Sequence, residues 1–351
     1  MKKFSVIIPA FNMEQFIGQT IRSAVNQEGI SLDELEILVI NDGSKDNTAH
    51  IVEELISEYG EAIQLVNLET NRGVISAAIT GLQRTTGQYI CLLDADDIWY
   101  PKKLSEVCTF LDNGYDLVMH GGDYIDRHGN RLDKLSERHP IQVRDDDIPY
   151  CIRTFNGGIP LGSCICFNKE KLNMDILLQA YNKYKETGLD RFVSHDTSIL
   201  HSILSNKNIK ATCIRKKLFG YRIHEGNNTL VSDSFNPEAI KNFFNHMQYS
   251  HMFGLEIYKL SGLYYEDRNI EVGFRKFIFY KQSMLKEKSI YHLLREYLFI
   301  HRNNGFTARN EKIKGLIDIF LHRLPPNAEF FLKICLKKLE NTAFKLLKTT
   351  K

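Results

Sequence analysis

Three carboxylates lie within four positions of the chain, at Asp94, Asp96 and Asp97. Charges packed this closely repel one another unless water or a divalent cation screens them. A cation that also binds a diphosphate would hold such a group together, because Mg²⁺ prefers carboxylate and phosphate oxygens. A solvated acidic turn is the alternative, since Asp is common in turns. The triplet Asp145-Asp146-Asp147 illustrates it, because no strand pattern precedes that triplet.

The elements that must position these carboxylates alternate regularly over the first hundred residues. Short apolar runs predict strands, and helical periodicity predicts the helices between them. This order implies an α/β fold with a mainly parallel, Rossmann-like sheet and helices on both faces. The predicted strands are Phe4 to Pro9, Glu36 to Ile40, Ile63 to Asn67 and Tyr89 to Leu93.

Ligands of such sheets bind beyond the carboxyl ends of the strands. Polar clusters follow three of the predicted strands, so the sequence predicts one site at one edge of the sheet. The clusters are Ala10-Phe11-Asn12, Asn41-Asp42-Gly43-Ser44 and Asp94-Ala95-Asp96-Asp97.

The pattern is less regular after this region, and the charge changes along the chain. A strand is expected at Ser163 to Phe167 and a helix near Thr197 to Ser205, and the sequence beyond Asn236 is helical, basic and aromatic. Residues 1–235 carry 25 Lys and Arg against 32 Asp and Glu, a net charge of −7, whereas residues 236–351 carry 20 against 11, a net charge of +9. The acidic part suits a cation-assisted site and the basic part an anionic surface.

Four ordered blocks over about one hundred residues resemble glycosyltransferase family 2, whose members have the GT-A fold. The order and spacing make this resemblance more specific than an Asp-x-Asp motif alone. It covers about residues 4 to 230 and implies a GT-A nucleotide-sugar-binding and catalytic domain at 1–235, followed by a helical region at 236–351. The blocks are Phe4 to Asn12, Val39 to Asp46, Asn71 to Gly73, and Leu92 to Asp97 with Trp99 and Pro101.

The resemblance implies that Pro9, Ala10, Asn12 and Asp42 hold the donor nucleoside. A carboxylate can accept a hydrogen bond from a uracil ring N–H, so Asp42 is a candidate for reading the base. A turn-forming role is its alternative. Glu14 is a candidate for a ribose contact or for capping a helix, and the sequence does not choose between them.

Arg72 and Gly73 resemble the segment that passes near the diphosphate and the sugar of the donor. A surface charge at a helix start is the alternative for Arg72. Asp94 and Asp96 match the Asp-x-Asp motif of the family, with one carboxylate near the ribose or donor sugar and the other toward Mg²⁺ or Mn²⁺. The cation would neutralise charge on the leaving nucleoside diphosphate. Asp97 is expected to orient its neighbours.

Relatives place an acidic pair at a helix start about a hundred residues after the Asp-x-Asp motif, and Asp196 stands there with His195 in place of the first acid. The resemblance makes Asp196 the candidate catalytic base, because an acceptor hydroxyl needs a proton acceptor. Capping of the helix is the alternative. Tyr221 to His224 resembles a downstream block in which the His approaches the metal or diphosphate. We therefore predict His224 as a metal ligand, with a structural histidine as the alternative.

The composition is that of a globular protein, with 351 residues, 43% hydrophobic and 25% charged. Seven cysteines without a C-x-x-C pair argue against a disulfide framework and favour a cytoplasmic location. Pro9, Asn12 and Glu14 interrupt the first apolar run, so no signal peptide is expected. No run approaches the roughly 18 apolar residues of a membrane-spanning helix.

The stretch Glu329 to Lys348 has the pattern of a basic amphipathic helix. Such a helix can lie on an anionic membrane, which here would be the inner face of the plasma membrane. It can also pack on the catalytic body or on a second subunit of a homo-oligomer. Nucleic-acid binding is not expected, because no recognised motif accompanies the basic charge.

The sequence thus predicts a metal-dependent inverting glycosyltransferase. It would move a sugar from a nucleotide donor to a glycan or lipid-linked glycan in surface polysaccharide assembly. The family resemblance implies that this donor is UDP-linked. The alternative is a catalytically inactive sugar-nucleotide or glycan-binding module of the same fold. An Asp-nucleophile phosphatase would carry its Asp-x-Asp after the first strand, whereas here the motif follows the fourth.

Overall fold

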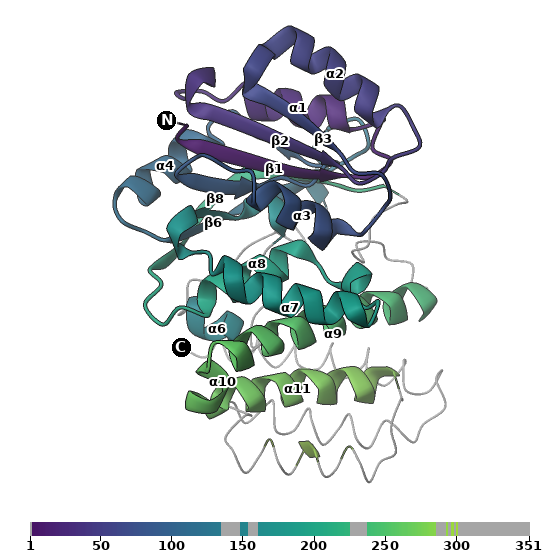
Figure 1. Cartoon of the computed structure of the whole chain (residues 1–351), viewed down its shortest axis with the longest axis vertical. Helices are drawn as coiled ribbons and strands as arrows, with labels where there is room; N and C mark the ends of the chain where they lie inside the picture. Colours follow the sequence, from purple (N-terminus) through teal and green to yellow (C-terminus); the bar gives the residue numbers. More distant parts are fainter. Residues whose placement is uncertain are drawn as a thin grey trace, which may run out of the picture. The chain divides into compact units, whose positions relative to one another are not determined.

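The computed structural model describes residues 2–134, 148–153, 161–224 and 237–285, together with Leu293, Glu296, Tyr297 and Ile300. Its centre is an eight-stranded sheet in the order β3-β2-β1-β4-β7-β6-β8-β5 (Figure 1). The strands are β1 Phe4–Ala10, β2 Leu35–Asn41, β3 Ile63–Asn67, β4 Tyr89–Leu92, β5 Ile98–Trp99, β6 Leu117–Ile125, β7 Cys166–Asn168 and β8 Ala211–Arg222.

The predicted α/β fold is confirmed. β1, β2, β3 and β4 pair in parallel, as the alternation of strands and helices requires. The sheet becomes mixed beyond β4, because β7 runs antiparallel to both β4 and β6, and β5 runs antiparallel to β8. The strand expected at Ser163 to Phe167 is partly wrong: a 3-10 turn, η3 Gly162–Cys164, comes first, and β7 begins at Cys166.

Helices cover both faces of the sheet. Figure 1 shows α1 and α2 on one face and α3 with α8 on the other. The helices are α1 Ile17–Val25, α2 Thr48–Tyr59, α3 Val74–Leu82, α4 Lys103–Asp112, α6 Ile148–Arg153, α7 Met174–Glu186, α8 His195–Leu204, α9 Pro237–Leu260, α10 Leu263–Glu266 and α11 Arg268–Leu285. None of them combines the length and apolar character that a membrane crossing needs.

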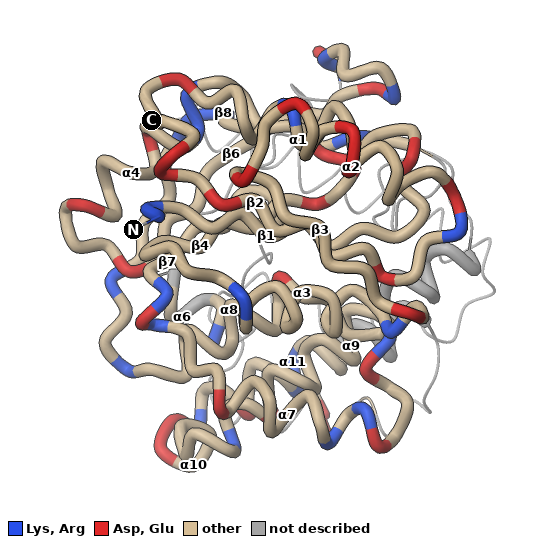
Figure 2. The backbone as a smooth tube through the Cα atoms, turned by 45° about the horizontal axis from the view of Figure 1, so that its top comes forward, with Lys and Arg blue, Asp and Glu red and all other residues tan. Residues whose placement is uncertain are grey.

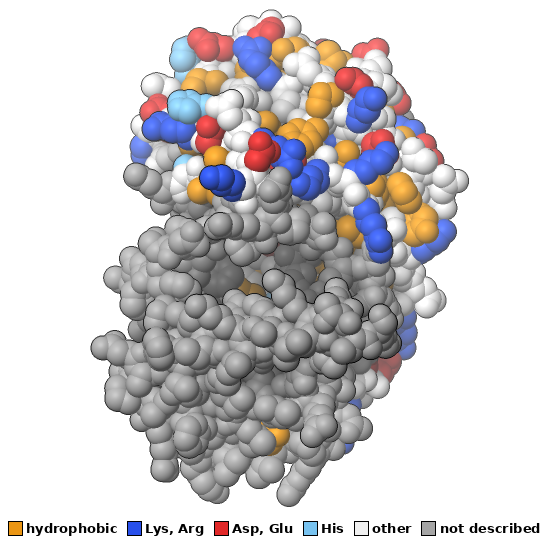
Figure 3. Space-filling view, turned by 180° about the vertical axis from the view of Figure 1, so that it is seen from behind, with side chains coloured by type: hydrophobic (Ala, Val, Ile, Leu, Met, Phe, Trp, Pro, Cys, Tyr) orange, Lys and Arg blue, Asp and Glu red, His pale blue; other side chains and the backbone are white. Residues whose placement is uncertain are grey.

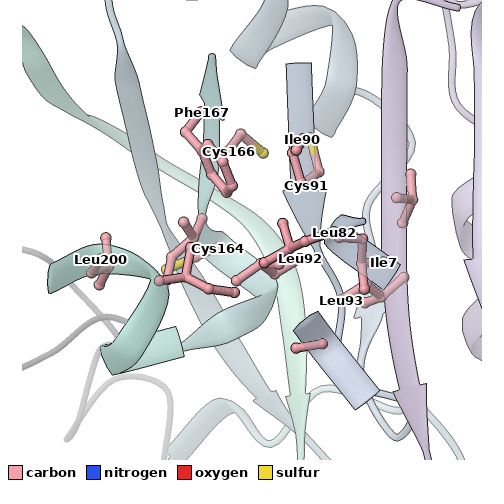
Figure 4. Packing of buried hydrophobic residues seen from close by; sticks show 14 of the residues in the cluster. Ile7, Leu82, Ile90, Cys91, Leu92, Leu93, Cys164, Cys166, Phe167 and Leu200 are labelled. Carbon is pink, nitrogen blue, oxygen red and sulfur yellow. The ribbon is translucent and has the colours of Figure 1, made fainter. Parts of the chain in front are cut away.

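The core lies between the sheet and the helices. Cys91 of β4 lies opposite Cys166 of β7, and Leu92 of β4, Leu82 of α3 and Leu200 of α8 belong to the same core (Figure 4). All of these side chains except Leu82, at 3%, are fully buried. Because a buried strand cannot shift without moving its neighbours, the loop that follows β4 starts from a fixed position.

The chain forms two compact units, Met1–Ile270 and Glu271–Lys351. The first extends past residue 235 because α9 packs against α7 and α8. The domain boundary between residues 235 and 236, which the sequence predicts, stays a prediction. Within the second unit, Arg275 pairs with Glu296 at 2.9 Å. The predicted amphipathic helix at Glu329 to Lys348 lies outside the described residues, as does the Asp145-Asp146-Asp147 triplet.

Candidate active site

The loops after β1, β2 and β4 meet at one edge of the sheet. β1 lies between β2 and β4 and runs parallel to both, so their carboxyl ends point the same way. Pro9 and Ala10 are buried in the last two positions of β1, and the Ala10 carbonyl accepts the N–H of Asp42 at 2.8 Å. Any contact from this strand end to a ligand would therefore come through the backbone.

Asp42 is a buried carboxylate that holds the next loop in place. Its Oδ1 accepts the N–H of Arg72 and its Oδ2 accepts the N–H of Gly73, both at 2.9 Å. Burial raises the pKa of Asp42, and these two hydrogen bonds work against that rise. Gly73 has φ of 88° and sits so close to Arg191 that a Cβ would lie 3.1 Å from the Arg191 Cα, so glycine is needed at this position.

Asn12 and Glu14 face the turn between β2 and α2. Asn12 Oδ1 accepts the N–H of Lys45, and Glu14 Oε2 accepts the N–H of Asn47, each at 2.9 Å. Glu14 thus supports the start of α2 rather than its own helix. Phe11, directly before Asn12, is 38% exposed at the same edge. The sequence did not predict a role for the Phe11 side chain.

The turn after β4 divides its three carboxylates between the interior and the surface. Asp97 is fully buried, where its Oδ2 accepts the Ser163 hydroxyl at 2.6 Å and its Oδ1 accepts the Arg222 N–H at 2.9 Å. Burial, with the charges of Asp96 and Asp94, raises the pKa of Asp97 well above its usual range. Asp97 therefore ties the turn to η3 and β8, in agreement with an orienting role.

Asp96 faces a histidine from the end of β8. Its Oδ2 lies 2.9 Å from Nε2 of His224, and both side chains are mostly shielded, with exposures of 17% and 15%. The His224 ring lies against Phe16, with 4.7 Å between ring centroids. A carboxylate oxygen and an imidazole nitrogen this close to each other are candidate ligands for one divalent cation such as Mn²⁺ or Mg²⁺. Among the described residues, no group of three or more His, Cys, Asp or Glu could hold a metal by itself.

Asp94 faces a second histidine, from the start of α8. Its Oδ1 lies 3.3 Å from Nε2 of His195, which is 5% exposed. Burial raises the pKa of Asp94; His195 works against the rise, and Asp96 and Asp196 add to it. Burial alone would lower the pKa of His195, but the Asp94 and Asp196 carboxylates raise it.

Gly162 packs closely against both members of the Asp94 and His195 pair. A Cβ on Gly162 would lie 3.0 Å from His195 Nε2 and 3.1 Å from Asp94 Oδ2. The neighbouring Ser163 hydroxyl accepts the Asp94 N–H at 3.0 Å. No sequence signal indicated Gly162 or Ser163, because they reach the turn across nearly seventy residues of chain.

Asp196 stands beside this pair in the first turn of α8. Its Oδ1 accepts the Ser194 hydroxyl and the Thr197 N–H, both at 2.6 Å. These bonds fix the carboxyl group at the helix start, while Oδ2 accepts no hydrogen bond from the residues that the structure describes. The structure therefore brings Asp94, Asp96, Asp196 and His224 together around one edge of the sheet. Asp42, which accepts the Gly73 N–H, follows β2 at the same edge.

Comparisons with known proteins find similar chains and folds. Residues 5–173 match the family model of glycosyl transferase family 2. An uncharacterized glycosyltransferase from Nostoc sp. is 27% identical over 67% of this chain and 69% of its own length. Another from Haemophilus influenzae is 38% identical over 35% of this chain, which is only 36% of that protein. The crystal structure of S. aureus TarS 1-349 in complex with UDP-GlcNAc has a TM-score of 0.51 at 18% identity, covering 91% of this chain and 81% of that one. The predicted GT-A fold is confirmed.

Proposed function

The chain belongs to glycosyl transferase family 2, whose domain occupies residues 5–173, and on that premise we propose how this glycosyltransferase works. It moves a sugar from a nucleotide-sugar donor to an acceptor hydroxyl, with help from a divalent cation and with inversion at the anomeric carbon. The observation that carries the proposal is the pairing of Asp96 with His224 and of Asp94 with His195 at one rim of the sheet.

The donor nucleotide binds over the loops after β1 and β2 in this proposal. Each Asp42 oxygen already accepts one backbone N–H and keeps a second lone pair that a uracil ring N–H can use. Phe11, which is partly exposed at the same edge of the sheet, would offer an apolar face to the base. A UDP-linked donor is consistent with this geometry and with the ligand of TarS.

Asp96 and His224 would hold Mn²⁺ or Mg²⁺. When bound, the cation would neutralise charge on the leaving nucleoside diphosphate. Asp94, oriented by His195, binds on the sugar side of the donor. Arg72 and Gly73 lie at the loop that Asp42 fixes and contact the diphosphate side.

Asp196 acts as the base. Its Oδ1 is held by Ser194 and Thr197, which leaves Oδ2 to accept the proton of the acceptor hydroxyl. The hydroxyl oxygen then attacks the anomeric carbon while the bond from that carbon to the diphosphate oxygen breaks. A glycan or lipid-linked glycan acceptor stays a prediction, as do the cytoplasmic location, the membrane contact and the homo-oligomer.

The test is release of nucleoside diphosphate from a panel of nucleotide sugars, with MnCl₂ or with EDTA. We expect one donor to be turned over with the metal, and raised thermal stability in its presence, because a ligand that binds only the folded state stabilises it. A chain that binds a donor but never turns it over, with acceptors supplied, would favour the inactive binding module. Equal turnover in EDTA would refute the metal's role.

A further inference from the structure

Arg222 is a charged side chain that lies fully inside the protein, with no exposed surface. It comes from the last position of β8, two residues before His224. Burying a guanidinium costs free energy unless its N–H groups are hydrogen-bonded. The hydrogen-bond partners of Arg222 therefore indicate its role. Because it is fully buried, Arg222 is poorly placed to bind the donor diphosphate directly.

The guanidinium joins three segments that are far apart in sequence. Its Nε donates to the carbonyl of Asp96 at 2.5 Å, and its Nη2 donates to Oε1 of Gln19 in α1 at 2.6 Å. Its Nη1 donates to the carbonyls of Asp126 and Arg127, at 3.2 and 2.8 Å, in the turn after β6. Four N–H groups of a rigid planar fork thus fix the Asp96 backbone relative to α1 and β6.

Arg222 also supports the His224 side of the Asp96 and His224 pair. The backbone N–H of Arg222 donates to Asp97 Oδ1, so the strand end and the acidic turn are joined twice. The guanidinium carbon lies 5.1 Å from the centroid of the Phe16 ring, and that ring also contacts His224. Phe16 therefore contacts both the Arg222 guanidinium and the His224 imidazole, so a shift of Arg222 would also move the imidazole.

We propose that Arg222 is a positioning residue that holds Asp96 and His224 facing each other before the metal and donor bind. This inference rests on the proposed function, since it concerns the same metal pair. Groups behind metal ligands typically affect metal affinity by about 10–100-fold. Lysine cannot replace the guanidinium here, because one ammonium group cannot reach three segments at once.

Arg153 gives a matched control. It also donates to three backbone carbonyls, those of Leu204, Asn206 and Lys207. These lie at and beyond the far end of α8 from His195, away from the carboxylate rim. Arg153→Lys therefore removes a comparable set of bonds without touching Asp96 or His224.

The experiment measures UDP affinity by calorimetry, once with Mn²⁺ and once with EDTA, for the wild-type chain, Arg222→Lys and Arg153→Lys. The ratio of the two affinities reports the contribution of the metal. We expect Arg222→Lys to lower this ratio by about tenfold or more while its affinity in EDTA is kept. Arg153→Lys should leave the ratio unchanged. The electron paramagnetic resonance spectrum of bound Mn²⁺ should also change only in Arg222→Lys.

An unchanged ratio in a folded Arg222→Lys protein would overturn the inference, and so would equal losses with Mn²⁺ and with EDTA. If Arg222→Lys does not fold, Gln19→Met decides, because it removes one guanidinium acceptor at the surface. We expect it to lower the ratio by about threefold, at the low end of such effects, and no change would overturn the inference. A wild-type ratio of one would instead refute the metal's role in the proposed function.

Discussion

The acidic side chains at the rim have different environments, although they carry the same functional group. Asp97 is fully buried and bonded to Ser163 and Arg222, so it serves the fold of the turn. Asp94 and Asp96 each face a histidine and stay partly exposed, so they can reach a ligand. Asp42 lies between these cases, because it is buried and, in the part of the chain that the structure describes, its carboxylate accepts only from backbone N–H groups.

Asp96→Ala removes one of the two proposed metal ligands. We expect transfer to fall by about a thousandfold or more, because the charge of the leaving diphosphate is no longer neutralised. The melting temperature should stay close to that of the wild type, since among the described residues the Asp96 carboxylate bonds only to His224. Asp133→Ala, at an acid with 71% exposure in a surface ion pair, is the control and should keep full activity.

Asp196→Asn tests the base and leaves the shape of the side chain intact. The amide oxygen can still accept from Ser194 and Thr197, so the start of α8 should be unchanged. We expect turnover to fall by about 10²–10⁴-fold with donor affinity retained, as for loss of a general base. Asp175→Asn, in the first turn of α7, should have no such effect. Full turnover by Asp196→Asn would exclude this residue as the base.

At the scale of elements, the site depends on short irregular segments set against regular ones. The turn η3 lies directly before β7 and contacts the loop after β4. There the Ser163 hydroxyl accepts the Asp94 N–H and donates to the Asp97 carboxylate. The start of α8 comes to the same place and brings His195 with it. Small shifts of η3 should therefore affect function before they affect stability.

Gly162→Ala tests this dependence on η3. Its Cβ would lie 3.0 Å from His195 Nε2 and about as close to both Asp94 oxygens, tighter than ordinary packing. We expect the catalytic efficiency with the donor to fall by at least about tenfold, the cost of misplacing a reacting group. Gly18→Ala in α1 is the control, because among the described side chains its Cβ meets only Ile51, at 3.4 Å. Equal activity of the two variants would contradict a role for this contact.

At the scale of the whole molecule, charge over the described residues is distributed among many elements rather than concentrated on one of them. Figure 2 shows acidic and basic residues spread over many elements. The described part of the face in Figure 3 has acidic, basic and hydrophobic side chains interspersed. The net charge of −7 over residues 1–235 therefore does not form one patch on that face. What distinguishes the rim is the convergence of specific carboxylates, not a broad negative field.

Global stability should fall in mild acid because of buried histidine. Burial, with the nearby Lys103 charge, lowers the pKa of His120 to about 3, against an unfolded value of 6.5. Below pH 6.5 the unfolded chain therefore binds a proton that the folded chain does not, so stability is lost as the pH falls. By pH 5.5 the loss is about 1.4 kcal/mol from this residue.

Urea unfolding at pH 7.5 and pH 5.5 measures this loss. His120→Met removes the titrating group, so the drop in unfolding free energy between the two pH values should shrink by about 1.4 kcal/mol. His50→Gln is the control, because His50 is 69% exposed and should leave the drop unchanged. An identical drop in His120→Met and the wild type would contradict the assignment.

The sequence by itself determined the parallel half of the sheet and the rim. Strands such as Ile63–Asn67 were predicted at their observed bounds, because short apolar runs between helices have few alternative structures. The polar clusters after β1, β2 and β4 were predictable for the same reason, since parallel strands place their carboxyl ends together. Local pattern carries this information, so no tertiary contact was needed.

Only the tertiary structure decided how each candidate side chain is used. Glu14 supports α2, Asp97 is buried under η3, and Asp94 meets His195 rather than Asp196. The contact from Arg222 to Asp96 spans 126 positions, and the contact from Arg222 to Gln19 spans 203. Such contacts have no local signature, because they arise from the packing of segments whose separation in the sequence does not constrain their distance in space.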